Sequence, residues 1–183
     1  MNGLNSMLVL PAAFLAVFLE SALDGPRNFL GAQIDLLPAL MVYAGLSQGI
    51  AAVSLLALCG GLWFDSLSAN PLGASVLPLL AIGLFICHQK ALVLRDELFA
   101  QLAVGFMASA LAPLLTVMLL LSAGQRPLIG WGSLWQWLVM AVGGAAFTPL
   151  FFQMFSRLKR FLNYQALPES TFHTNREMKR GRT

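Results

Sequence analysis

Charge is scarce in this sequence. Only 10% of the 183 residues are charged, whereas 58% are hydrophobic. Soluble globular domains have roughly 25% charged and 45–50% apolar residues. The composition therefore excludes an ordinary soluble domain, and it predicts that the solvent of this chain is a lipid bilayer.

Groups that bind metals or phosphates are equally sparse. The two cysteines, Cys59 and Cys87, are isolated within apolar runs, where they are interpreted as packed thiols. The glycine pairs in LCGGLWF and AVGGAAF lie in continuous apolar runs, without the lysine or the strand of a phosphate-binding loop. We therefore expect no metal site, no cofactor, no nucleic-acid partner and no nucleotide-driven activity of the chain alone.

Long apolar runs are what the sequence has in abundance. Six runs contain no Lys or Arg and have Asp35 as their single acidic residue: Met7–Leu19, Ile34–Leu46, Gly49–Phe64, Ala74–Cys87, Leu98–Ala123 and Leu134–Phe155. The last two have the roughly 20 residues that cross about 30 Å of hydrocarbon, and the others need flanking residues to do so. The second covers only about 20 Å, so a short, a tilted and a re-entrant helix all remain open. The expected fold class is all-α: a polytopic membrane helical bundle of about six transmembrane helices.

The basic residues predict the orientation of this bundle. The first run is expected to be a retained span, because MNGLNS lacks the basic residues of a signal peptide. With six spans, nine of the 11 Lys and Arg residues fall on the side of the two termini, and only Arg27 and Arg126 fall opposite. Because cytoplasmic loops are enriched in Lys and Arg, both termini are expected in the cytoplasm.

The end of the chain changes character after the sixth run. In QMFSRLKRFLNY, apolar residues share one helical face and Arg157, Lys159 and Arg160 share the other, which is typical of an interfacial helix that binds anionic lipid headgroups. We expect a transmembrane domain at 1–163 and a basic, disordered cytoplasmic tail at 164–183. The tail either anchors by charge or docks to a protein.

Prolines and small residues predict how the spans pack. Every run except the third contains a proline, and each is expected to kink its helix and free a carbonyl group that neighbouring helices must satisfy. Pairs of small residues four apart are candidate close contacts between helices: Ala12 with Ala16, Gly45 with Gly49, and Ala108 with Ala112.

One carboxylate lies between two apolar runs, in GLWFDSLSANPLGASVLP. Near the outer end of a span, Asp65 can reach water or accept hydrogen bonds from backbone N–H groups, and this structural role is preferred over contact with a ligand or partner. Asn70, Pro71 and Gly73 are typical of a shaped turn. The four tryptophans also fall at predicted outer ends, where they are expected to be interfacial anchors: Trp63, Trp131, Trp135 and Trp137.

Catalytic arrangements are not evident. The two histidines, His88 and His173, are predicted on the cytoplasmic side, across the membrane from Asp65, so a Ser-His-Asp triad cannot assemble. A proton or ion pathway needs ionisable residues in mid-span, and Asp35 is placed near the outer face. We therefore expect a protein that is not an enzyme.

The Asp65 stretch resembles the signature of the bacterial rod shape-determining protein MreD family. In that family a Gly-Leu-x-x-Asp helix end leads through a loop to Leu-Gly and the next span. The matching positions here are Gly61, Leu62, Asp65, Ser68, Pro71, Leu72 and Gly73. They cover under a tenth of the chain, and the GWGSLWQW stretch and the long basic tail depart from the family pattern.

This resemblance implies a function in cell shape. It implies a non-catalytic subunit of the inner membrane that binds MreC and couples MreB filaments to the synthases of lateral peptidoglycan. The family is similar in fold to the substrate-binding S-components of energy-coupling-factor vitamin transporters, so a solute-binding subunit is the alternative. In that case we expect polar residues to converge into a ligand site at the outer ends of the spans: Gln33, Asp35, Asp65, Ser66, Ser68 and Asn70.

Overall fold

Helices are the regular secondary structure of the described part of the chain. The computed structural model describes residues 3–22, 31–68, 71–90, 97–125 and 130–164, and these contain no strand. Its helices are α1 (Gly3–Ala22), α3 (Leu37–Ser47), α4 (Ile50–Leu67), α5 (Val76–Gln89), α6 (Leu98–Ser122) and α7 (Trp131–Tyr164). The chain forms two compact units, Met1–Phe152 and Gln153–Thr183. The all-helical expectation is confirmed for these residues.

Each of the six apolar runs overlaps one helix. Three helices are long and apolar enough to cross a membrane: α4, α6 and the Trp131–Leu158 part of α7. The other three apolar helical segments are shorter: Val9–Ala22 of α1, α5, and α3 with only 11 residues. At about 1.5 Å per residue α3 extends for only about 16 Å, so the run that looked least able to span the bilayer does form the shortest helix.

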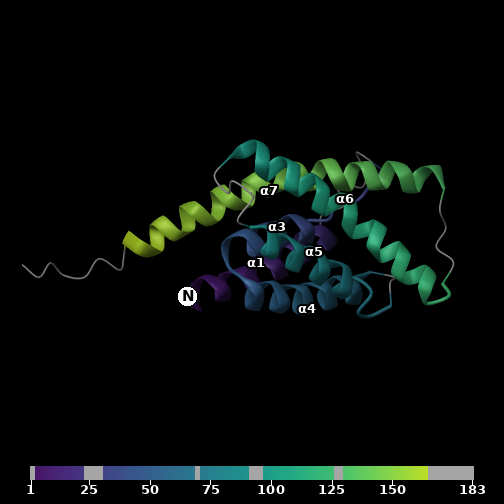
Figure 1. Cartoon of the computed structure of the whole chain (residues 1–183), viewed down its shortest axis with the longest axis horizontal. Coiled ribbons are helices and arrows are strands. Elements are labelled where there is room, and N and C mark those ends of the chain that lie inside the picture. The colour runs from purple at the N-terminus through teal and green to yellow at the C-terminus, as the bar shows by residue number, and fades with distance from the viewer. Residues whose placement is uncertain (1–2, 23–30, 69–70, 91–96, 126–129, 165–183) are drawn as a thin grey trace, which may run out of the picture. The chain divides into compact units, whose positions relative to one another are not determined.

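The short helix α3 lies at the centre of the first unit. Its residues from Leu37 to Leu46 are all buried. It packs against α1, α4, α5 and α6 (Figure 1). A helix that is apolar on every face lies in a protein core or in lipid, and for α3 the surrounding helices provide the apolar environment.

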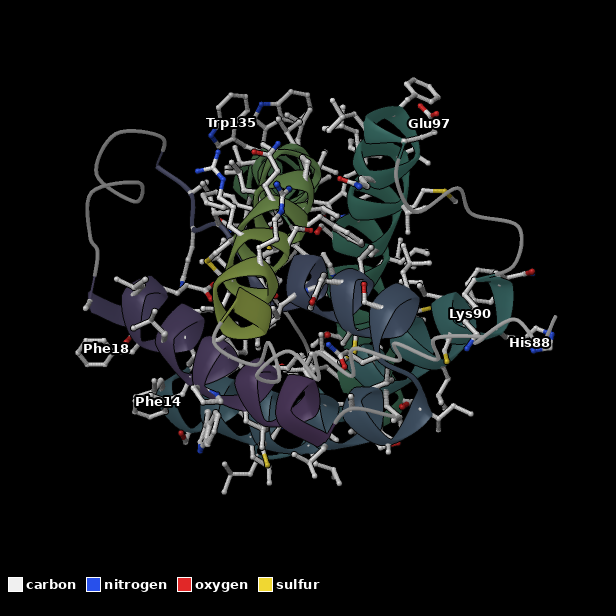
Figure 2. The ribbon with its side chains drawn as sticks, turned by 90° about the vertical axis from the view of Figure 1, so that its left-hand side faces the viewer. Phe14, Phe18, His88, Lys90, Glu97 and Trp135 are labelled. Atoms are coloured by element: carbon white, nitrogen blue, oxygen red, sulfur yellow. The ribbon has the colours of Figure 1, made fainter. Side chains whose placement is uncertain are left out.

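The outer faces of the surrounding helices are apolar as well. Phe14 and Phe18 lie on the outer face of α1 (Figure 2), and each is 55% exposed. Helices α4, α5 and α6 expose leucines and phenylalanines in the same way. A bundle that is apolar both inside and outside fits a lipid environment and would expose a large apolar surface in water.

Small residues permit close contacts at the centre of the bundle. A Cβ atom at Gly83 of α5 would lie 2.5 Å from Cγ1 of Val53 and 2.6 Å from Sδ of Met41. At Gly45 of α3 it would lie 2.9 Å from Cγ2 of Ile86. Gly49, the predicted partner of Gly45, has a φ angle of 127° in the turn between α3 and α4 and serves the turn instead.

Of the five prolines inside the apolar runs, two do not interrupt a helix, which corrects the expectation of a kink in those two runs. Pro38 and Pro78 lie in the first turns of α3 and α5, where the backbone N–H has no partner within the helix to lose. Pro11, Pro113 and Pro149 do lie inside helices. Near Pro113, the indole N–H of Trp137 donates a 2.7 Å hydrogen bond to the carbonyl oxygen of Ala110. A neighbouring helix therefore donates to a carbonyl adjacent to that of Ser109, which is the carbonyl that Pro113 leaves without its helical N–H partner.

We expect Gly83→Ala to destabilise the bundle by about 1–3 kcal/mol, because the new methyl group overlaps Val53 and Met41. Gly132→Ala is the matched control, since a Cβ atom there meets nothing within 4 Å. Thermal unfolding followed by size-exclusion chromatography in detergent measures both variants. Equal melting temperatures would contradict the close packing of α5 against α3 and α4.

Candidate functional site

Asp65 joins the end of α4 to the beginning of α5. The side chain is 2% exposed in the last turn of α4. Its Oδ2 atom accepts hydrogen bonds from the backbone N–H groups of Gly73, at 2.8 Å, and Ser75, at 3.1 Å. Ser75 is the residue directly before α5. The carboxylate thus pairs with N–H groups at a helix start, which is the kind of partner that the sequence predicts for it.

Gly61 lets the same two helices approach each other. It lies one turn before Asp65, and a Cβ atom on it would lie 2.8 Å from Cγ2 of Val76 and 3.0 Å from the Val76 nitrogen. Residues four apart share a helix face. Gly61 and Asp65 therefore act together, one by leaving room for the α5 backbone and the other by binding it.

The turn between α4 and α5 depends on Gly73. Gly73 has a φ angle of 93°, a conformation that other residues rarely adopt. The backbone N–H of Ala74 donates to the carbonyl oxygen of Pro71 at 3.1 Å. Asn70 lies outside the described residues. The described turn residues thus present the N–H groups of Gly73 and Ser75 to Asp65.

The two serines beside Asp65 are occupied by the backbone of their own helix end. The Ser66 hydroxyl donates to the carbonyl oxygen of Trp63 at 2.7 Å, and the Ser68 hydroxyl donates to that of Asp65 at 3.4 Å. The Oδ1 atom of Asp65 is buried without a hydrogen-bond partner among the described residues. None of these three side chains lines the cavity described next.

A cavity of about 290 Å³ opens at the end of the bundle where α4 and α6 finish and α5 and α7 begin. Three polar residues line it: Asp35, Ser75 and Thr116. The rest of the lining is apolar, from Leu37, Phe64, Pro78, Leu79, Ala112, Pro113, Val117, Leu120 and Met140. Ligand sites are often of this kind, concave and apolar with a few placed polar groups.

Asp35 is the charged group of the cavity. It precedes α3, outside the helix, and is 8% exposed. Its Oδ1 atom accepts a 2.9 Å hydrogen bond from the backbone N–H of Leu37, at the start of α3. Burial raises the pKa of Asp35 to about 6, and the Leu37 N–H opposes this increase.

A second carboxylate lies within electrostatic range of Asp35. Glu20, near the end of α1, has two buried carboxylate oxygens. Neither Glu20 nor Asp35 forms an ion pair with a Lys or Arg of the described ranges. This end of the first unit therefore concentrates acidic side chains that no described basic residue neutralises.

Gln136 of α7 fixes the segment that carries Asp35, and sequence reasoning did not identify it. Its amide nitrogen donates to the carbonyl oxygen of Gln33 at 2.7 Å, and its amide oxygen accepts from the Gln33 N–H at 3.0 Å. One face of α7 continues this contact, because Met140 lines the cavity and a Cβ atom at Gly143 would lie 2.7 Å from Cγ2 of Ile34. Gln136 belongs to GWGSLWQW, which thereby acquires a structural role.

The remaining predicted site residues are dispersed. Trp63 packs edge-on against Phe14 at 5.3 Å between ring centroids, whereas Trp131 and Trp135 are largely exposed. In the second unit Arg157 and Arg160 are exposed, and the Lys159 side chain lies outside the described residues. These anchor roles stay predictions.

The cysteines and histidines do not form a site. Cys59 and Cys87 are free thiols on different helices. His88 lies in the last turn of α5, near Lys90 (Figure 2), while His173 lies outside the described residues. The described ranges contain no cluster of three residues able to hold a metal ion.

Comparison with known proteins finds no family model, no curated protein and no solved structure that matches this chain.

Asp65→Asn and Asp65→Leu separate the two roles of this carboxylate. We expect the asparagine variant to insert into the membrane and keep most function, because an amide oxygen also accepts N–H donors. Asp65→Leu leaves the N–H groups of Gly73 and Ser75 unpaired, at a cost of about 1–3 kcal/mol each, and should impair folding or assembly. Complementation at matched protein levels measures both. Equal and complete loss of function in both, at normal levels, would indicate a charge-dependent site instead.

Asp35→Asn should stabilise the protein at neutral pH. A carboxyl group with a pKa of about 6 in the folded state and 3.8 ordinarily is destabilising once ionised, so this cost is full above pH 6 and absent below about pH 4. The asparagine variant should therefore unfold at a higher temperature than the unmodified protein at pH 7.5, with the gain shrinking at pH 4.5. A gain independent of pH would contradict the buried, ionised carboxylate.

Proposed function

We propose that this protein is a non-catalytic inner-membrane subunit of the bacterial cell-elongation complex. In this role it binds MreC and helps couple MreB filaments to the synthases of lateral peptidoglycan, which maintains cell shape. The observation that carries the proposal is the resemblance of the Gly61 to Gly73 stretch to the MreD signature. The resemblance is supported by geometry, since Gly61, Asp65 and Gly73 act in one helix junction.

The proposed topology has six spans with both termini in the cytoplasm. It is supported by the three long apolar helices, by the excess of basic residues on one predicted side and by the three shorter apolar helices. Short α3 would lie within the bundle rather than in contact with lipid, because it is covered by α1, α4, α5 and α6. The exposed residues Arg157 and Arg160 would contact anionic headgroups.

An adaptor subunit needs helix faces that other membrane proteins can contact. The described helices offer such faces in large apolar residues on α1 and α6, among them Phe14, Phe18 and Phe106. Association within the bilayer relies on packing and on hydrogen bonds between helices rather than on the hydrophobic effect. Apolar faces without a reactive cluster suit a subunit that assembles other proteins.

A substrate-binding subunit of a vitamin transporter, similar to an S-component, is the second candidate. The specific observation in its favour is the cavity bordered by Asp35, Ser75 and Thr116. The predicted convergence of six polar residues is met there by Asp35 alone. Gln33 is held by Gln136, and Asp65, Ser66 and Ser68 bond to backbone groups at the α4 end.

Photo-crosslinking in the native membrane tests the two functions. A photoreactive phenylalanine replaces Phe14 or Phe106, which are exposed, or Met41, which is buried and serves as the matched control. We expect the exposed positions to capture MreC and elongation synthases before detergent is added, and Met41 to capture neither.

Mass spectrometry of the captured proteins gives the outcome. Recovery of a transducing subunit with paired ATPases would establish the transporter candidate and refute the elongation subunit. Recovery of lipids alone from both exposed positions would contradict an adaptor that uses these faces.

A further inference from the structure

The cavity beside Asp35 is unlike the lipid-facing surface around it. Its volume of about 290 Å³ exceeds the roughly 150 Å³ that suffices to hold a benzene molecule in an engineered protein cavity. It lies near the lower end of the volume range of small-molecule sites, roughly 300–1,000 Å³. A single aromatic ring system with a short side arm is the size of molecule that fits.

The polar groups of the cavity are mainly hydrogen-bond acceptors. The carboxylate of Asp35 accepts hydrogen bonds, and one of its oxygens already binds the N–H of Leu37. The Thr116 hydroxyl donates a hydrogen bond to the carbonyl oxygen of Ala112, at 3.0 Å, so its lone pairs remain as acceptors for a ligand in the cavity. A ligand that pairs with Asp35 and Thr116 must therefore bring donors, whereas the Ser75 hydroxyl can donate or accept.

The charge around the cavity selects among donor-bearing ligands. Asp35 lies in electrostatic range of Glu20, and no Lys or Arg of the described ranges pairs with either. An anionic ligand would be repelled by the Asp35 carboxylate. A lipid acyl chain would leave a buried carboxylate against hydrocarbon, which is unfavourable. A cationic group answers both constraints.

We infer that this cavity is a binding site for a small amphipathic amine, whose apolar body contacts Leu79, Val117 and Met140 and whose ammonium group pairs with Asp35. The site is built rather than incidental, because three contacts hold residues of its lining or the segment that carries them. Gln136 binds the segment before α3, the N–H of Leu37 binds the Asp35 carboxylate, and Asp65 binds the backbone N–H of Ser75. The inference is independent of the proposed adaptor function, since it concerns the interior of the first unit alone.

Three indole compounds that differ only in the end of their side arm test the inference. Tryptamine carries an ammonium group, tryptophol a hydroxyl and indole-3-acetate a carboxylate. Each is titrated against the full chain in lipid nanodiscs at pH 7.5, with empty nanodiscs as the blank, by ligand-observed saturation-transfer NMR. We expect saturable binding of tryptamine, about tenfold weaker binding of tryptophol and no saturable binding of indole-3-acetate.

Variants then locate the binding. Asp35→Asn should make tryptamine and tryptophol bind equally, because the ion pair is lost while the cavity remains. Val117→Phe should fill the cavity and abolish binding of both, whereas Val142→Phe on the exposed face of α7 should change neither. Thr116→Val replaces the hydroxyl with a methyl group and should weaken tryptamine binding a few-fold. This variant takes the place of Val117→Phe in the test if the Val117→Phe protein does not fold.

Three results would overturn the inference. One is equal binding of all three compounds by the unmodified protein, which indicates partition into lipid. Another is a preference for tryptamine that survives Asp35→Asn. The last is undiminished binding in a folded Val117→Phe protein. None of these results bears on which proteins the crosslinking experiment captures, so the two proposals fail separately.

Discussion

One carboxylate oxygen, Oδ2 of Asp65, organises the polar end of the first unit. By accepting the N–H groups of Gly73 and Ser75 it fixes where α5 begins relative to where α4 ends. Phe64, the residue before Asp65, lines the cavity, and so does Ser75, whose backbone N–H binds Asp65. The close contact of Gly61 with Val76 needs the same alignment. Packing of α5 against α3, and the shape of the cavity, therefore depend on a hydrogen-bonded junction that buries a charge.

Several features of this architecture could be predicted from the sequence. The six apolar runs largely coincide with the six described helices, because a long run without Lys or Arg can be recognised from the sequence alone. Asp65 was identifiable as a residue near a helix end, since a carboxylate in mid-span is costly. The proline prediction failed at Pro38 and Pro78 because an apolar run does not say at which residue the helix begins. Those prolines occupy first turns, where they are compatible with a straight helix.

The cavity and its supports could not be predicted, because they depend on contacts between distant parts of the chain. Nothing local in GWGSLWQW indicates that Gln136 bonds to Gln33, and no periodicity indicates that α3 is buried on every side. Apolar residues in a membrane protein face lipid and protein alike, so the pattern that separates inside from outside in a soluble helix is missing. Of the described polar residues expected to converge, only Asp35 lines the cavity, because Asp65, Ser66 and Ser68 bond to nearby backbone groups and Gln33 bonds to Gln136.

The Gln33–Gln136 contact also bears on how the protein is made. The two residues are 103 positions apart, and at roughly 5–20 residues per second the ribosome needs on the order of 5–20 s to pass from one to the other. The Asp65 junction closes over only eight to ten residues and can form as soon as the start of α5 has been synthesised. The contact between Gln33 and Gln136 must wait until the first turns of α7 have been synthesised.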